Sequence, residues 1–130
     1  YSLIDREIEK DILPYCIEDN VGVITYGSLG GGILTGKYQK PPQVGKFDAR
    51  SMFYKFFKGD KFDQIKKGLE ELKEFGWPLN QLALNWVRQQ PGIMTVLAGC
   101  RLPSQVISNM SAADWELSKV EIEAIRKIKF

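Results

Sequence analysis

The sequence predicts an α/β fold with parallel strands, and three observations lead to this prediction. Short apolar runs rich in β-forming residues lie at 2–4, 21–26 and 93–98 of the 130 residues. The second and third runs are apolar at successive positions, which is typical of strands that are buried on both faces. A helical pattern follows each run, so right-handed crossovers between parallel strands are expected.

The first two helices are predicted from apolar residues that recur on one helix face. Between positions 8 and 16 an isoleucine or cysteine appears at every fourth position, and Asn20 is expected to end this helix. Pro14 lies inside the pattern and is expected to interrupt or kink the helix. A second apolar stripe covers 62–72 and is expected to end at Gly76.

Three more helices are predicted toward the end of the chain. An apolar stripe at 79–87 follows Pro78, which suits the first turn of a helix. Pro103 is expected to open a short helix after the third strand for the same reason. The residues at 118–121 form a capping-box pattern ahead of a terminal helix, whose apolar residues lie at 122–128.

Residues 1–130 are treated as a single domain, because the sequence has no internal repeat, low-complexity tract or clear domain boundary. The stretch 39–60 is the irregular part of this domain. At roughly twenty residues it is longer than an ordinary connection, so it is expected to be functional or mobile.

The composition excludes several classes of function. The chain has no histidine, which removes Ser–His and Cys–His nucleophile pairs, imidazole acid–base chemistry and histidine metal sites, and no metal is expected. A net charge of +2 gives no reason to expect a nucleic-acid partner. No stretch approaches the roughly 18 apolar residues of a membrane span. The two cysteines favour a reducing, cytoplasmic location.

A glycine-rich segment at 26–36 follows the second predicted strand. Five glycines between 27 and 36 allow positive φ angles and let backbone N–H groups approach an anion. Ligands of parallel α/β sheets bind at the carboxyl ends of the strands, so this position suits a ligand. The spacing matches neither a dinucleotide fingerprint nor a P-loop. Both a phosphate-binding loop and a plain glycine-rich turn therefore remain open.

A second candidate segment follows the third predicted strand. Arg101 stands just before the helix that Pro103 opens, beside free N–H groups and the positive end of the helix dipole. This arrangement suits a phosphate monoester. Gln105 and Asn109 share one face of that helix. The alternative is an exposed arginine and two amides on a solvated helix. Taken together, the two segments place anion-binding groups at the ends of successive strands.

A series of motifs runs through the whole chain in a recognisable order. The motifs are Leu3–Arg6, Ile12–Cys16, Val23–Leu29, Gly32–Lys37, Gln81–Trp86, Ala98–Arg101 with Gln105 and Asn109, Ala112–Trp115, and Leu117–Ser118. They closely resemble the aldo-keto reductases, from Tyr1 to Phe130. The resemblance covers only the last part of that family's barrel. It implies the C-terminal part of a (β/α)₈ TIM barrel, with the sixth, seventh and eighth strands and their helices.

The resemblance implies that this part of the barrel binds a nicotinamide dinucleotide. The ring of Tyr26 would stack on the nicotinamide. The residues Gly27, Leu29 and Gly31 would lie along the pyrophosphate. Ser28 stands where proline is common in the family.

The resemblance also implies NADP(H) as the cofactor. The residues that hold the adenosine and its 2′-phosphate in the family match Gly99, Arg101, Gln105 and Asn109. A contact with the 2′-phosphate would favour NADPH over NADH. Ser108 stands where the family usually has glutamate, so one adenine contact is not carried over.

The resemblance assigns no catalytic residue to this chain. The family's Asp, Tyr, Lys and His tetrad lies in its first half, which nothing here matches, and the five tyrosines occupy none of the family's acid positions. The complete enzyme would transfer hydride from the nicotinamide to a small carbonyl substrate. The stretch 39–60 resembles the large loop that folds over cofactor and substrate. This chain is expected to hold the cofactor and to be inactive by itself.

The alternative is a non-catalytic, truncated barrel module that acts through cofactor or protein binding. Three parallel strands leave two sheet edges and an inner face uncovered, so association with a missing N-terminal half or with a second copy is expected. A fragment that binds flavin or a sugar phosphate is a third option, which the motif after the third strand argues against. Aromatic and basic residues between 46 and 58 resemble a nucleic-acid surface, but a loop packed on the barrel explains them as well.

Overall fold

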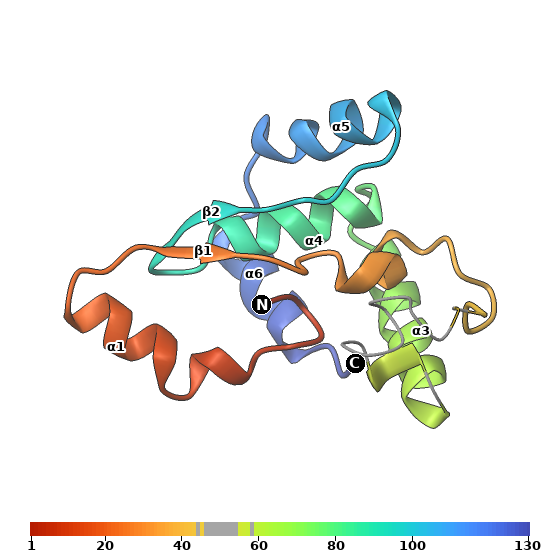
Figure 1. Cartoon of the computed structure of the whole chain (residues 1–130), viewed down its shortest axis with the longest axis horizontal. Helices are drawn as coiled ribbons and strands as arrows, with labels where there is room; N and C mark the ends of the chain where they lie inside the picture. Colours follow the sequence, from red (N-terminus) through yellow and green to blue (C-terminus); the bar gives the residue numbers. More distant parts are fainter. Residues whose placement is uncertain (44, 46–54, 58) are drawn as a thin grey trace.

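The computed structural model of the chain describes residues 1–43, 45, 55–57 and 59–130. Half of the predicted irregular stretch 39–60 lies outside the described residues, and so do most of the aromatic and basic residues that resemble a nucleic-acid surface. The aromatic residues Phe56 and Phe57 are described: Phe57 is buried in the core, and Phe56 packs against it. The regular elements, drawn in Figure 1, are helices and two short strands. They are α1 (Ile12–Glu18), β1 (Val23–Thr25), α3 (Asp60–Lys73), α4 (Leu79–Arg88), β2 (Ile93–Val96), α5 (Pro103–Met110) and α6 (Lys119–Lys127), with 3₁₀ turns at Glu7–Glu9, Gly30–Thr35, Lys55–Phe57 and Ser111–Ala113.

The two strands pair in parallel, as the sequence predicts, with α3 and α4 in the crossover between them. Thr25 lies opposite Val96 in the register, and the Thr25 carbonyl oxygen accepts a hydrogen bond from the Leu97 amide at 2.9 Å. The carboxyl ends of both strands therefore lie side by side (Figure 1). This edge is where ligands of parallel sheets bind.

The prediction of a strand at 2–4 is wrong. Ser2 and Asp5 instead form an isolated antiparallel bridge with two backbone hydrogen bonds, so the chain turns back at this point. Both apolar residues of the run contribute to the core: Leu3 is buried in it, and the half-buried Ile4 packs against it. The backbone nitrogen of Tyr1 donates to the Tyr26 carbonyl oxygen at 3.1 Å, which places Tyr1 beside the end of β1.

The first helix begins later than predicted, and Pro14 does not interrupt it. Residues 7–9 form a separate 3₁₀ turn, and α1 begins after Asp11, whose side chain accepts from the Ile12 amide at 2.7 Å. Pro14 is thus the third helical residue, where a backbone N–H has no partner within the helix. Asn20 follows the helix with a φ of 56°, which confirms it as the stop.

The remaining helices confirm the sequence pattern with small shifts at their ends. Pro78 is the N-cap residue directly before α4, although it was expected in the first turn of the helix. Pro103 is the first residue of α5. Ser118 and Glu121 form the predicted capping box at the start of α6, since each side chain accepts from the other residue's backbone amide. No described helix is long and apolar enough to cross a membrane.

The hydrophobic core lies on one side of the two strands, between α3, α4 and α6 (Figure 1). Helix α4 lies against β2, and its buried residues include Leu82, Trp86 and Val87. The prediction that the strands are buried on both faces is wrong for this chain. Ile24 is 62% exposed and Met94 is 77% exposed, because no described element covers them.

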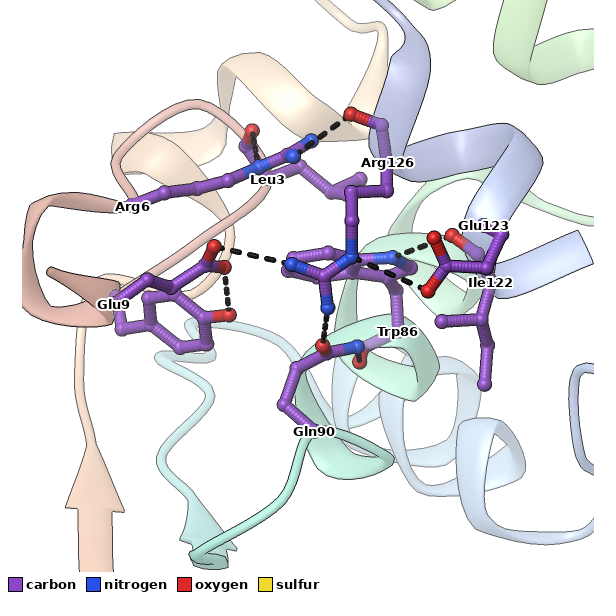
Figure 2. A network of polar contacts seen from close by, with 9 residues as sticks. Leu3, Arg6, Glu9, Trp86, Gln90, Ile122, Glu123 and Arg126 are labelled. Carbon is purple, nitrogen blue, oxygen red and sulfur yellow. Dashed lines mark hydrogen bonds and ion pairs between the residues drawn. The ribbon is translucent and has the colours of Figure 1, made fainter. Parts of the chain in front are cut away.

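A polar network ties the start of the chain to α4 and α6, and Figure 2 shows it from close by. The buried indole of Trp86 lies against two guanidinium groups, at 4.7 Å from Arg6 and 5.4 Å from Arg126. Its Nε1 donates to the Ile122 carbonyl oxygen at 3.3 Å. Such cation–π contacts are strongest where water is excluded.

In the same network the two guanidinium groups donate hydrogen bonds to acceptors from three segments of the chain. Arg6 donates to the carbonyl oxygen of Arg126 at 2.9 Å. Arg126 donates to the Glu9 carboxylate at 3.1 Å and to the side-chain oxygen of Gln90. Glu9 also accepts a hydrogen bond from the hydroxyl of Tyr1. The network therefore fixes the N-terminal turn, and with it Tyr1, on the helical layer.

Candidate functional site

A pocket of about 740 Å³ opens at the carboxyl ends of β1 and β2. Two segments that are far apart in the sequence form most of its lining, one after each strand, and α4 contributes one further side chain. The lining residues are Gly27, Ser28, Leu29, Gly31, Gly32, Thr35, Lys37, Asn80, Leu97, Gly99, Cys100, Arg101, Ser104, Gln105, Ser108 and Asn109.

The glycine-rich segment forms a tight turn that needs its glycines. Gly30, Gly31 and Gly32 have φ angles of 56°, 61° and 96°, in the left-handed region that other residues rarely adopt. A Cβ at Gly30 would also come 2.8 Å from the Cδ1 atom of Ile4. The hydroxyl of Thr35 donates to the Gly32 carbonyl oxygen at 2.8 Å and closes the turn. The backbone can therefore lie along the pocket without side chains in the way.

The opposite wall of the pocket is built by the segment before α5 and by the first turns of that helix. The side-chain oxygen of Gln105 accepts from the backbone amides of Arg101 at 2.8 Å and Leu102 at 3.3 Å. The backbone amides of Arg101 and Leu102 are thus bonded within the protein. The Gln105 side chain fixes the backbone that carries Arg101.

The charge of the lining is positive. Its described residues include the cations Lys37 and Arg101 and no aspartate or glutamate. An anion in this pocket would therefore meet attraction from both walls, and no carboxylate of the described lining would repel it.

Seven of the eight residues predicted to bind the dinucleotide line this one pocket: Gly27, Leu29, Gly31, Gly99, Arg101, Gln105 and Asn109. The eighth, Tyr26, is not in the lining and is 77% exposed at the end of β1. The structure brings the two segments together, while the binding roles of these residues remain predictions.

Sequence reasoning missed several polar residues of the pocket. Lys37 follows the glycine-rich turn directly, so a cation next to a possible phosphate loop was a signal that could have been used. Asn80 gave no such signal, because it reaches the pocket only through the packing of α4 beside α5. Among the described residues, no cluster of cysteine and acidic side chains could hold a metal ion.

The fold and the pocket define a class of protein: an α/β unit of two parallel strands, with a cationic pocket at the carboxyl ends of these strands. The sequence profile of the Aldo/keto reductase family matches residues 1–129. The chain therefore belongs to this family.

Individual relatives are similar to this chain over nearly its whole length. The chain is 30% identical to the aldo-keto reductase YhdN of Bacillus subtilis and 26% identical to an NADH-specific methylglyoxal reductase of Escherichia coli. Each match covers 98% of this chain and 40% of the relative. A solved structure, a glycerol dehydrogenase from Gluconobacter oxydans, matches with a TM-score of 0.84 and 32% identity, over 98% of this chain and 40% of that one. The chain thus spans about two fifths of the length of these relatives.

Proposed function

We propose that this chain is the C-terminal, cofactor-binding portion of an NADP(H)-dependent aldo-keto reductase that reduces small carbonyl compounds to alcohols. In this proposal β1 and β2 are the seventh and eighth strands of the (β/α)₈ barrel, and Tyr1 lies at the end of the sixth. The observation that carries the proposal is that the two predicted segments together line one pocket at the strand ends.

The pocket fits a dinucleotide in size and in chemistry. Small-molecule and cofactor sites commonly enclose about 300–1,000 Å³, and this pocket has about 740 Å³. A dinucleotide phosphate carries several negative charges, and the described lining offers Lys37, Arg101 and a glycine-rich backbone without any carboxylate. The donor set is therefore the one that phosphate groups require.

Each wall would hold a different part of the cofactor. The turn with Gly27, Leu29 and Gly31 would lie along the pyrophosphate, since its glycines let the backbone approach closely. Arg101, whose backbone is fixed by Gln105, would pair with the 2′-phosphate. Gly99 and Asn109 would bound the adenosine on the same side.

The nicotinamide end would lie toward Tyr26, whose exposed ring is available for stacking. When bound, the nicotinamide supplies the hydride that reduces the carbonyl carbon. The residues of this chain would hold and orient the dinucleotide, and none of them is assigned to proton transfer. A cytoplasmic location belongs to the same proposal, supported by two free cysteines, Cys16 and Cys100.

A titration of the 130-residue chain tests the proposal. Binding of NADPH and of NADH would be followed by the fluorescence of the reduced nicotinamide. We expect NADPH to bind at least about tenfold more tightly, because only it presents the 2′-phosphate to Arg101. Arg101→Gln should weaken NADPH binding about 10- to 100-fold and leave NADH binding nearly unchanged.

The matched control removes the same charge outside the pocket. Lys67→Gln, on the exposed face of α3, should bind both dinucleotides like the unmodified chain. Equal affinity for NADPH and NADH would contradict the cofactor assignment, and no binding of either would contradict the proposal as a whole.

A second candidate function is a non-catalytic barrel module that acts through cofactor or protein binding. The exposed strand residues Ile24 and Met94 favour it, because an apolar sheet face is normally covered. In the module reading the cover would be another protein or a second copy of this chain, whereas in the first proposal it would be the N-terminal half of the barrel. Intact mass followed by sedimentation separates the cases: a mass of 14.8 kDa without nucleotide binding would favour the module.

A further inference from the structure

Helix α5 lines one wall of the pocket but has no buried residue of its own. Its apolar side chains Val106, Ile107 and Met110 are 48%, 70% and 66% exposed. A helix of eight residues is marginal in water by itself, and most helical stability in proteins comes from a packed apolar face. Polar contacts with neighbouring segments therefore account for much of the placement of α5.

Asn80, in the first turn of α4, makes such a contact. Its side-chain Nδ2 donates to the Ser108 hydroxyl at 2.9 Å and to the Asn109 side-chain oxygen Oδ1 at 2.9 Å. The start of α4 is itself held by the hydrophobic core, in which Leu79 and Leu82 are buried. Asn80 thus ties a helix without buried residues to a helix that the core fixes.

Side chains of α5 in turn hold the segment that carries Arg101. The Gln105 oxygen accepts from the backbone amides of Arg101 at 2.8 Å and Leu102 at 3.3 Å. The Nδ2 of Asn109 donates to the sulfur of Cys100 at 3.2 Å. Three consecutive residues, 100–102, are therefore bonded to α5, and their position follows the position of that helix.

The side chain of Arg101 is available to a ligand. Among the described residues its guanidinium makes no hydrogen bond and no ion pair, and the residue lines the pocket. A guanidinium can hold a phosphate through two parallel hydrogen bonds, and this pairing depends on its orientation. A shift of the segment 100–102 would therefore weaken a phosphate contact of Arg101 more than contacts with the glycine-rich turn on the opposite wall.

We propose that Asn80 is a positioning residue for Arg101. By tying α5 to α4 it sets the orientation of the guanidinium, and with it the preference of the pocket for a dinucleotide that carries one more phosphate. This inference rests on the proposed cofactor function, in which Arg101 pairs with the 2′-phosphate. It adds a residue of α4 that acts through α5 and needs no contact with the cofactor.

The test measures the dissociation constants of NADPH and NADH on the 130-residue chain by the fluorescence of the reduced nicotinamide. Asn80→Ala removes both bonds to α5, and alanine suits the interior of α4. We expect NADPH to bind about five- to tenfold more weakly, the worth of about one hydrogen bond, and NADH to change less than about twofold. The preference for NADPH should fall accordingly.

The matched control is the next residue of α4. Gln81 lies outside the lining, and its side-chain oxygen accepts from the Trp115 Nε1 at 3.3 Å. Gln81→Ala therefore removes a side-chain hydrogen bond from the same helical turn without touching α5, and it should keep both affinities. Should Asn80→Ala fail to fold, Ser108→Ala removes one of the two bonds from the α5 side and should lower the preference about two- to threefold.

A double variant separates positioning from direct contact, because Asn80 itself lines the pocket. In a chain that already carries Arg101→Gln, Asn80→Ala should change NADPH binding less than about twofold, since no guanidinium remains to be positioned. A residue that touched the cofactor, or that only stabilised the fold, would keep its full effect in this background.

Three results would overturn the inference while leaving cofactor binding standing. They are an unchanged preference in both Asn80→Ala and Ser108→Ala, an equal loss of NADPH and NADH binding in Asn80→Ala, and a full effect of Asn80→Ala in the Arg101→Gln background. Equal affinity of the unmodified chain for NADPH and NADH would overturn the cofactor assignment, and failure of both to bind would overturn the proposed function. Either result would overturn this inference as well.

Discussion

The two faces of the β1–β2 sheet have similar side chains and different surroundings. On the covered face, Ile93 and Val96 pack against the hydrophobic core, and α4 lies against β2 with the indole of Trp86 fully enclosed. On the other side, Ile24 and Met94 are exposed to 62% and 77%. The apolar character of the strands is therefore matched by a packed layer on one side only.

This difference shows which contacts the chain supplies itself. On the helical side the chain supplies these contacts itself: Trp86 donates a hydrogen bond to Ile122 and lies against the guanidinium groups of Arg6 and Arg126. The open face has no such partner among the described residues. A barrel uses this kind of face as its interior, which explains why the strands are apolar on both sides.

The largest expected effect comes from removing the centre of the covered face. Trp86→Ala should lower the free energy of unfolding by about 3–5 kcal/mol, because it leaves a cavity and removes the contacts to two guanidinium groups. Ile24→Ala, the matched change on the open face, should cost less than about 0.5 kcal/mol. Urea unfolding followed by circular dichroism measures both. A large cost for Ile24→Ala would mean that the open face is covered in solution.

A second prediction concerns association through the open face. If this face drives contact between copies, Ile24→Lys combined with Met94→Lys should weaken self-association at least about tenfold, since each change places a charge in an apolar contact. Val120→Lys, at an exposed apolar residue of α6, is the control and should leave association unchanged. Sedimentation velocity over a range of concentrations measures the effect. A monodisperse monomer that unfolds cooperatively would show that no cover is needed.

The helices could be predicted because their signals are local. The capping box at Ser118 and the proline at the start of α5 act within one turn, and both lie where the pattern placed them. The strand at 2–4 could not be excluded in the same way. Whether an apolar tripeptide pairs as a strand or turns back depends on partners elsewhere in the chain, and here Leu3 is buried beneath a turn.

The same reasoning explains the partial prediction of the site. The glycine-rich turn and Arg101 follow strands, and parallel strands end at one edge, so their meeting in one pocket could be expected. Asn80 reaches that pocket from the first turn of α4, and no local pattern encodes this. The predicted interruption at Pro14 was wrong because the start of the helix was misplaced. The helix begins at Ile12, so Pro14 lies in its first turn, where a backbone N–H has no partner within the helix.

A third prediction concerns the polar network that borders the covered face. The pKa of the Tyr1 hydroxyl is raised above its ordinary value of 10, first by burial and then by the hydrogen bond to Glu9. The protonated form is therefore the one stabilised by folding. Its contribution is fully present below pH 10 and is lost as the pH rises above that value.

Tyr1→Phe should accordingly lower the free energy of unfolding by about 1 kcal/mol at pH 8, through loss of the bond to Glu9. The difference between the two proteins should shrink above pH 10, and urea unfolding at pH 8 and pH 11 measures it. A difference that stays constant over this range would show that the hydroxyl is no better protected from ionisation than in the unfolded chain.

The last prediction concerns the exposed start of α6, where local structure acts almost alone. Ser118→Ala removes the side-chain acceptor for the Glu121 amide and should cost about 1 kcal/mol. Hydrogen bonds from the Ser118 hydroxyl and amide lower the pKa of Glu121 below its ordinary value of 4.5. The stability that this carboxylate adds is therefore present above pH 4.5 and is lost as the pH falls below it. Thermal unfolding of both proteins at pH 7 and pH 3 should show the larger difference at pH 7. An equal difference at both values would mean that the cap acts through the serine alone.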